Sequence, residues 1–75
     1  MSFMVMPHLE RMTETEYESE MLEILRDIPK AFHSFVRSHA WERGHSSGYE
    51  EVILIANNLV DELAPAIKAY NESRK

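Results

Sequence analysis

The sequence has 75 residues, enough for one small domain, and its 13 acidic and 8 basic residues give a net charge of −5. This balance argues against direct nucleic-acid binding, because contacts to phosphates need basic side chains. The absence of cysteine excludes disulfides and thiolate metal sites and fits a cytoplasmic location, and no apolar run reaches the roughly 18 residues of a membrane-spanning helix.

Residues 1–12 are apolar without a clear period and contain four methionines together with Phe3, Val5 and Pro7. Chain ends that lack a packing pattern are commonly mobile. We therefore expect a flexible N-terminal arm at 1–12, followed by a single helical domain at 13–75.

The first predicted helix spans 14–27. Thr13 and Glu16 match a capping box, in which each side chain binds the other residue's backbone amide. The apolar residues that follow step by three and four along the chain: Tyr17, Met21, Ile24 and Ile28. Glutamates at every second position from 14 to 20 make the first turns acidic nearly all round.

The second predicted helix spans 29–43. Pro29 suits the first turn of a helix and disfavours helical geometry for the residue before it, which marks a boundary. The apolar stripe again steps by three and four: Phe32, Phe35, Val36, His39 and Ala40. Trp41 lies off the centre of this stripe, so we expect it to be partly exposed. This segment is basic, and we expect it to attract the acidic first helix.

The third predicted helix spans 48–72 and carries the strongest stripe of the chain: Tyr49, Val52, Ala56, Leu59, Leu63, Ala66 and Tyr70. Ser47 and Glu50 form a second candidate capping box at its start. Pro65 lacks an amide proton and crowds the preceding turn, so we expect a kink or a break near 61–65.

The apolar arc of the third helix covers about half of its circumference, which is more than one neighbouring helix can bury. A chain of this length is also marginally stable alone, and oligomerisation is a common remedy. We therefore expect a homo-oligomer, with a dimer as the first choice, and assign its self-association to Val52, Ile55 and Leu59.

Residues 44–48 permit two interpretations. Gly44 could end the second helix in a left-handed cap, which gives a turn and a small all-α bundle of three helices. Alternatively, Ala40, Gly44 and Gly48 place small residues on one face of a single long helix that merges the second and third. We favour the turn and predict the all-α three-helix bundle.

The sequence gives little support for catalysis or metal binding. The spacing of Glu42 and His45 is one that helical di-iron sites use, but those sites need the motif twice. No phosphate-binding glycine loop or nucleophile motif is present. We therefore predict no catalytic residues, no metal and no cofactor.

One alternative follows from the pairs Glu20-x-x-Glu23 and Asp61-Glu62. These acids resemble those of MazG-type all-α nucleotide pyrophosphohydrolases, in which carboxylates from two helices hold magnesium. The resemblance implies a magnesium-dependent hydrolase. Asn58 departs from the family pattern, which has a glutamate there, and no basic cluster for phosphate accompanies the acids.

The segment 41–49 is rich in the residue types that dominate binding hot spots. The acidic first helix could also place carboxylates where a basic surface expects phosphates. We predict a non-catalytic interaction protein whose partner is a protein or protein complex. The predicted partner-binding residues are Glu14, Glu16, Glu18, Glu20, Glu23, Trp41, Arg43 and Tyr49.

The phrase HAWERGHSSGYEEV and the acidic helix after it, about residues 39–62, resemble short accessory proteins of bacteriophages. The resemblance implies expression in the cytoplasm of an infected bacterium and inhibition of a host protein or defence complex, as anti-CRISPR proteins do. A structural or assembly component is a further alternative.

Overall fold

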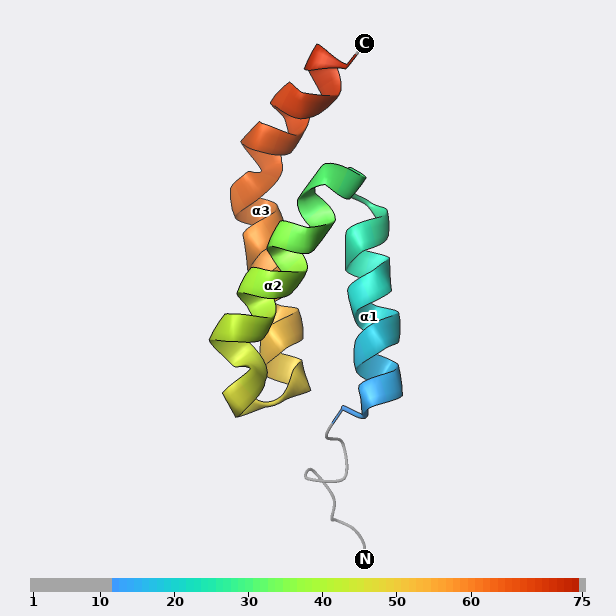
Figure 1. Ribbon diagram of the computed structural model, residues 1–75, viewed down its shortest axis with the longest axis vertical. Coiled ribbons are helices and arrows are strands. Elements are labelled where there is room, and N and C mark those ends of the chain that lie inside the picture. The colour runs from blue at the N-terminus through green and yellow to red at the C-terminus, as the bar shows by residue number, and fades with distance from the viewer. Residues whose placement is uncertain (1–11, 75) are drawn as a thin grey trace, which may run out of the picture.

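Residues 12–74 are described by the computed structural model, and they form three α-helices linked by short 3₁₀ turns (Figure 1). The elements in chain order are α1 (Glu14–Arg26), η3 (Lys30–Phe32), α2 (His33–Gly44), η4 (His45–Ser47) and α3 (Tyr49–Ser73). The prediction of an all-α three-helix fold is confirmed. The predicted N-terminal arm lies outside the described residues except for Met12.

The two shorter helices both lie along the N-terminal half of α3. Figure 1 shows α1 and α3 running in the same direction, with α2 antiparallel to them, and the C-terminal end of α3 projecting beyond its neighbours. The fold is accordingly elongated, at 57 × 20 × 18 Å. Both α1 and α2 contact α3 more extensively than they contact each other. The broad apolar arc of α3 is therefore shared between two neighbours within one chain.

The core lies where the three helices meet. Its buried residues are Tyr17, Met21, Leu25, Ile28, Val36, Ala40, Val52, Ile53, Ala56 and Leu59. Most of them are spaced by three or four residues, because that spacing keeps side chains on one face of a helix. The predicted stripes are wrong at Phe35, His39 and Ala66, which are exposed, and Leu25 rather than Ile24 is buried. No polar or charged residue of the described part of the chain is buried.

The two predicted capping boxes have different outcomes. At α1 the box is confirmed: the Glu16 amide donates to Thr13 Oγ1 at 3.1 Å, and the Thr13 amide donates to Glu16 Oε1 at 3.0 Å. The box at Ser47 is wrong. Ser47 belongs to η4, and Gly48 precedes α3 without any side-chain cap.

The connection between α2 and α3 is a turn, so the merged long helix is wrong. Gly48 makes the turn with a φ of 113°, a backbone conformation that glycine adopts without the steric penalty of a Cβ atom. The left-handed cap predicted at Gly44 is also wrong, because Gly44 has a φ of −123°. The residue with a positive φ therefore lies four positions later than predicted, although α2 still ends at Gly44 and α3 begins at Tyr49.

A break near Pro65 does not occur, since α3 continues through Pro65 to Ser73. Proline removes the hydrogen bond to the carbonyl of Asp61. Both residues are exposed, so water can satisfy that carbonyl. The second helix also differs in detail, because Pro29 precedes a 3₁₀ turn and the α-helix begins only at His33.

Small residues bring α2 close to α3. Gly44 and Ala40 are both buried on the face of α2 that meets α3. A Cβ atom added to Gly44 would lie 2.9 Å from the Val52 amide nitrogen and 3.0 Å from Ile55 Cδ1. The backbones leave no room there for a side chain, so the small residues allow the close approach although the helix is not continuous.

We predict that Gly44→Ala destabilises the fold. In an open helical site this change stabilises by up to about 1 kcal/mol, whereas overpacking against backbone costs about 1–3 kcal/mol. The free energy of unfolding, measured by urea titration and circular dichroism, should therefore fall. Ser46→Ala, at an exposed neighbouring position, should leave it unchanged. A Gly44→Ala protein as stable as the parent would contradict the tight contact.

Candidate functional site

An open groove of about 400 Å³ separates α1 from α2 and has the start of α3 at one end. Its lining residues are Glu14, Tyr17, Glu18, Ser34, Arg37, Ser38, Trp41 and Tyr49. We call it the α1–α2 groove. Four of the predicted partner-binding residues, Glu14, Glu18, Trp41 and Tyr49, lie together here.

Three aromatic rings form one wall of the α1–α2 groove. Tyr17 stacks on Tyr49 with ring centroids 4.8 Å apart, and Trp41 lies 6.0 Å from Tyr17 and 6.3 Å from Tyr49. They meet because Tyr17 is in the first turns of α1, Trp41 is near the end of α2 and Tyr49 begins α3. The topology brings these three points to the same end of the bundle.

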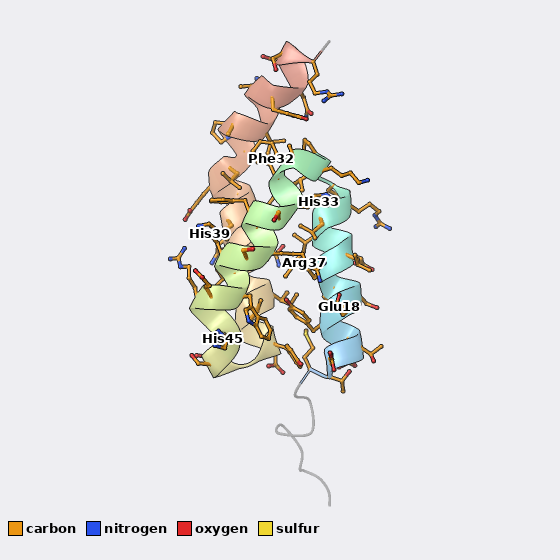
Figure 2. All side chains as sticks on the ribbon, in the orientation of Figure 1. Glu18, Phe32, His33, Arg37, His39 and His45 are labelled. Carbon is orange, nitrogen blue, oxygen red and sulfur yellow. The ribbon has the colours of Figure 1, made fainter. Side chains whose placement is uncertain are left out.

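Trp41 is the most accessible of these rings, with 43% of its surface exposed, although it is held in place. The His45 ring stacks on it at 5.2 Å and 17°, and His45 Nδ1 donates to the Trp41 carbonyl at 2.8 Å. Figure 2 places His45 at the end of α2. A fixed but exposed indole suits recognition, since little side-chain freedom is lost when a partner covers it.

A second, smaller hollow of about 280 Å³ adjoins the groove on the other side of Trp41 and Tyr49. It is also lined by Met12, His45, Gly48 and Glu50. The Met12 amide donates to the Glu50 carboxylate, which ties the start of the described chain to α3. The two aromatic residues therefore form a ridge between two depressions.

Charged residues line the rim of the α1–α2 groove. Arg37 Nη2 donates to Glu18 Oε1 at 3.1 Å, and Figure 2 shows these residues on the two neighbouring helices. Their side chains are 39% and 47% exposed, and such pairs contribute about 0–1 kcal/mol. The predicted attraction between an acidic first helix and a basic second helix is thus present as one exposed ion pair.

The remaining acids of α1 lie apart from the groove. Glu16, Glu20 and Glu23 are separated by four and three residues, which places them along one exposed face, and Asp27 continues that row. We call this row the outer acidic face. The predicted partner-binding glutamates therefore divide between two surfaces. Arg43 is exposed on α2 and does not line the groove.

The assignment of self-association to Val52 and Leu59 is wrong. Val52 has no exposed surface and Leu59 only 6%, because both fill the core of one chain. Ile55 is partly buried, and its Cδ1 atom lies close to Gly44. Val52 and Leu59 therefore complete the fold of a single chain and offer no surface to a second copy, whereas Ile55 keeps part of its surface exposed. The homo-oligomer itself stays a prediction.

The acids that suggested a magnesium site do not converge. Within residues 12–74, no group of three or more carboxylates and imidazoles could hold a metal ion. The pair Glu20 and Glu23 on α1 therefore does not meet Asp61 and Glu62 on α3 in the way that the hydrolase alternative requires.

The histidines of the helices make local hydrogen bonds to carbonyl groups. His33 Nε2 donates to the Ile28 carbonyl and His39 Nδ1 to the Phe35 carbonyl, each at 3.0 Å, and His45 binds Trp41 as described. Figure 2 labels all three. Their role in the structure is to fix helix ends and neighbouring rings.

Comparison with known proteins leaves the function to be argued from geometry. No protein family, curated protein or solved structure gives a significant match to this chain. Among the described helices, none is long and apolar enough to cross a membrane.

Four groove residues were not predicted to bind a partner: Tyr17, Ser34, Arg37 and Ser38. Tyr17 was assigned to the core stripe, and it is indeed buried, yet its ring also lines the groove. Arg37 gave no signal beyond the basic character of its segment. Its pairing with Glu18 depends on how α1 and α2 are rotated about their axes, which no local pattern specifies.

The contribution of Tyr17 to the stability of the fold depends on pH. Burial raises the pKa of its hydroxyl above the ordinary value of 10.0, and the Arg37 guanidinium acts in the opposite direction. Because the folded chain favours the protonated phenol, its contribution to stability is complete below about pH 10 and is lost as the pH rises through the folded-state pKa.

We therefore predict that the free energy of unfolding falls more steeply above pH 10 for the parent protein than for Tyr17→Phe. Urea titrations at pH 8 to 11 measure both curves. Parallel curves for the two proteins would show that Tyr17 ionises as easily in the folded state as in the unfolded state.

Proposed function

We propose that this chain is a non-catalytic interaction protein that binds another protein through the α1–α2 groove. The observation that carries the proposal is Trp41, a fixed aromatic side chain with 43% of its surface exposed beside Tyr17 and Tyr49. Tryptophan and tyrosine are enriched in binding hot spots because they bury a large apolar area and still have a polar edge.

The shape of the surface supports a macromolecular partner. The groove and the adjoining hollow flank the ridge of Trp41 and Tyr49, so a partner segment can cover the ridge and fill both depressions. Polar side chains such as Glu14, Ser34 and Ser38 surround the aromatic wall. An apolar centre inside a polar rim is the usual composition of a protein interface.

The charge of α1 indicates the kind of partner. Carboxylates line the groove at Glu14 and Glu18 and continue on the outer acidic face, so α1 presents negative charge on both sides. Such a helix attracts a basic surface and speeds its encounter with it. We infer that the partner is a basic, nucleic-acid-binding host protein and that the chain inhibits it by occupying the surface where phosphates bind.

This role agrees with the resemblance to bacteriophage accessory proteins, which implies an inhibitor acting in the cytoplasm of an infected bacterium. The carboxylates would compete with phosphate groups for the same arginine and lysine side chains of the host protein. Inhibition of this kind is stoichiometric and needs no chemistry by the inhibitor.

Trp41→Ala should abolish capture of the partner from a bacterial host lysate by tagged protein. Phe35→Ala is a matched control: Phe35 lies on the same helix, is 41% exposed, and its ring contacts His39, whose Nδ1 donates to the Phe35 carbonyl, in the way His45 donates to Trp41. At about 100° per residue, the two aromatics face different directions.

A host protein retained by the parent and by Phe35→Ala, but lost with Trp41→Ala, supports the proposal. Equal retention by all three proteins would show that binding does not use the groove. Mass spectrometry of the retained fractions distinguishes these outcomes, and added DNA or RNA should compete for the retained protein.

A further inference from the structure

The charge of the α1–α2 groove indicates which side chain it accepts. Glu14 and Glu18 are one helical turn apart on α1, so both carboxylates reach the same side of the groove. Arg37 is the one cationic side chain among the groove's lining residues, and it binds Glu18. Within the described part of the chain, the Glu14 carboxylate has no hydrogen-bond partner. The groove therefore holds more negative than positive charge.

Arg37 also shows how the groove holds a guanidinium group. Its Nη2 atom lies 3.1 Å from Glu18 Oε1 and 3.4 Å from Glu18 Oε2, so one nitrogen is shared between both carboxylate oxygens. The pair is exposed to water, and pairs of this kind contribute little to stability. A guanidinium from another molecule can replace that of Arg37 at small cost.

The aromatic wall supplies the rest of the arginine site. A guanidinium stacks on aromatic faces and its methylene stem packs against them, while its planar edge matches a carboxylate. Trp41 and Tyr49 line the same groove as the two glutamates, so the groove offers both kinds of contact. Lysine would keep the charge but lose the planar edge and the stacking.

We propose that the α1–α2 groove binds an arginine side chain of the partner protein, with its guanidinium between Glu14 and Glu18 and its stem across Trp41. The partner's arginine then displaces Arg37 from its ion pair with Glu18. This inference rests on the proposed function and names the contact that it uses: an arginine that would otherwise bind a phosphate.

The test uses the intact protein and three acetylated pentapeptide amides, Gly-Ser-X-Ser-Gly, in which X is arginine, lysine or neutral citrulline. Trp41 is the only tryptophan of the chain, so its indole NH resonance reports on the groove directly. The arginine peptide should shift this resonance in a saturable way. The lysine peptide should bind more weakly, and the citrulline peptide should not bind.

Four single variants locate the contact. Glu14→Gln and Glu18→Gln should each weaken binding of the arginine peptide by about two- to fivefold, the range of exposed ion pairs. Arg37→Ala should tighten it by a similar factor of about two to five, because Arg37 no longer competes for Glu18. Glu72→Gln removes the same charge from the exposed end of α3, outside the groove, and should change nothing. All four residues are at least partly exposed, so the fold should persist in each variant.

The proposal is overturned if Glu72→Gln weakens binding as much as Glu18→Gln, since the attraction would then be general. It is also overturned if the arginine peptide leaves the indole resonance unmoved in Arg37→Ala at millimolar concentration. The proposed function fails separately, if the capture experiment retains a host protein equally with the parent and with Trp41→Ala. Retention that depends on Trp41 but not on Glu14 or Glu18 would instead support the proposed function and overturn the arginine contact.

Discussion

At Gly44 the backbone of α2 lies against the first turn of α3, with no room for a side chain between them. Much of the fold depends on this contact. Because Ala40 and Gly44 line the seam, α2 packs closely on one part of the apolar arc of α3, and α1 covers the remainder. The two shorter helices therefore share α3 and stand further from each other. A larger residue at position 44 would push α2 outward and change the spacing on which the groove depends.

The α1–α2 groove follows from that arrangement. Two helices that both pack on a third leave a channel between them. Here the rings of Tyr17, Trp41 and Tyr49 line this channel near the start of α3. The exposed Arg37–Glu18 pair and the contact between the Tyr17 and Trp41 rings cross the channel, and the channel stays open beside them. The Tyr17 ring is part of the core and also lines the groove, so it contributes both to stability and to the proposed binding surface. The same aromatic residues therefore support the helix packing and provide the binding surface that we propose.

The features that could be predicted from the sequence depend on interactions between residues close together in the chain. The capping box at Thr13 depends on spacing alone, and the structure confirms it. Most residues of the predicted stripes lie in the core or against it, but Phe35, His39 and Ala66 are exposed because the neighbouring helices do not cover them. The turn was harder, because both Gly44 and Gly48 could have made it. Gly44 is needed for a close approach between helices, which depends on tertiary packing, and Gly48 takes the left-handed backbone. The groove could not be predicted for a similar reason. Arg37 and Glu18 form an ion pair only because of the rotation of α1 and α2 about their own axes. Buried Val52 and Leu59 were assigned to a second copy because the sequence could not show that two helices of the same chain cover them.

The proposed function requires that a protein partner covers the ridge of Trp41 and Tyr49. The most direct measurement is NMR cross-saturation from the captured host protein to the isotopically labelled chain. Signal losses should centre on the Trp41 indole and extend to Tyr17 and to the Glu14 side of α1. Losses confined to the outer acidic face or to the projecting end of α3, with the Trp41 indole unaffected, would contradict the proposed function.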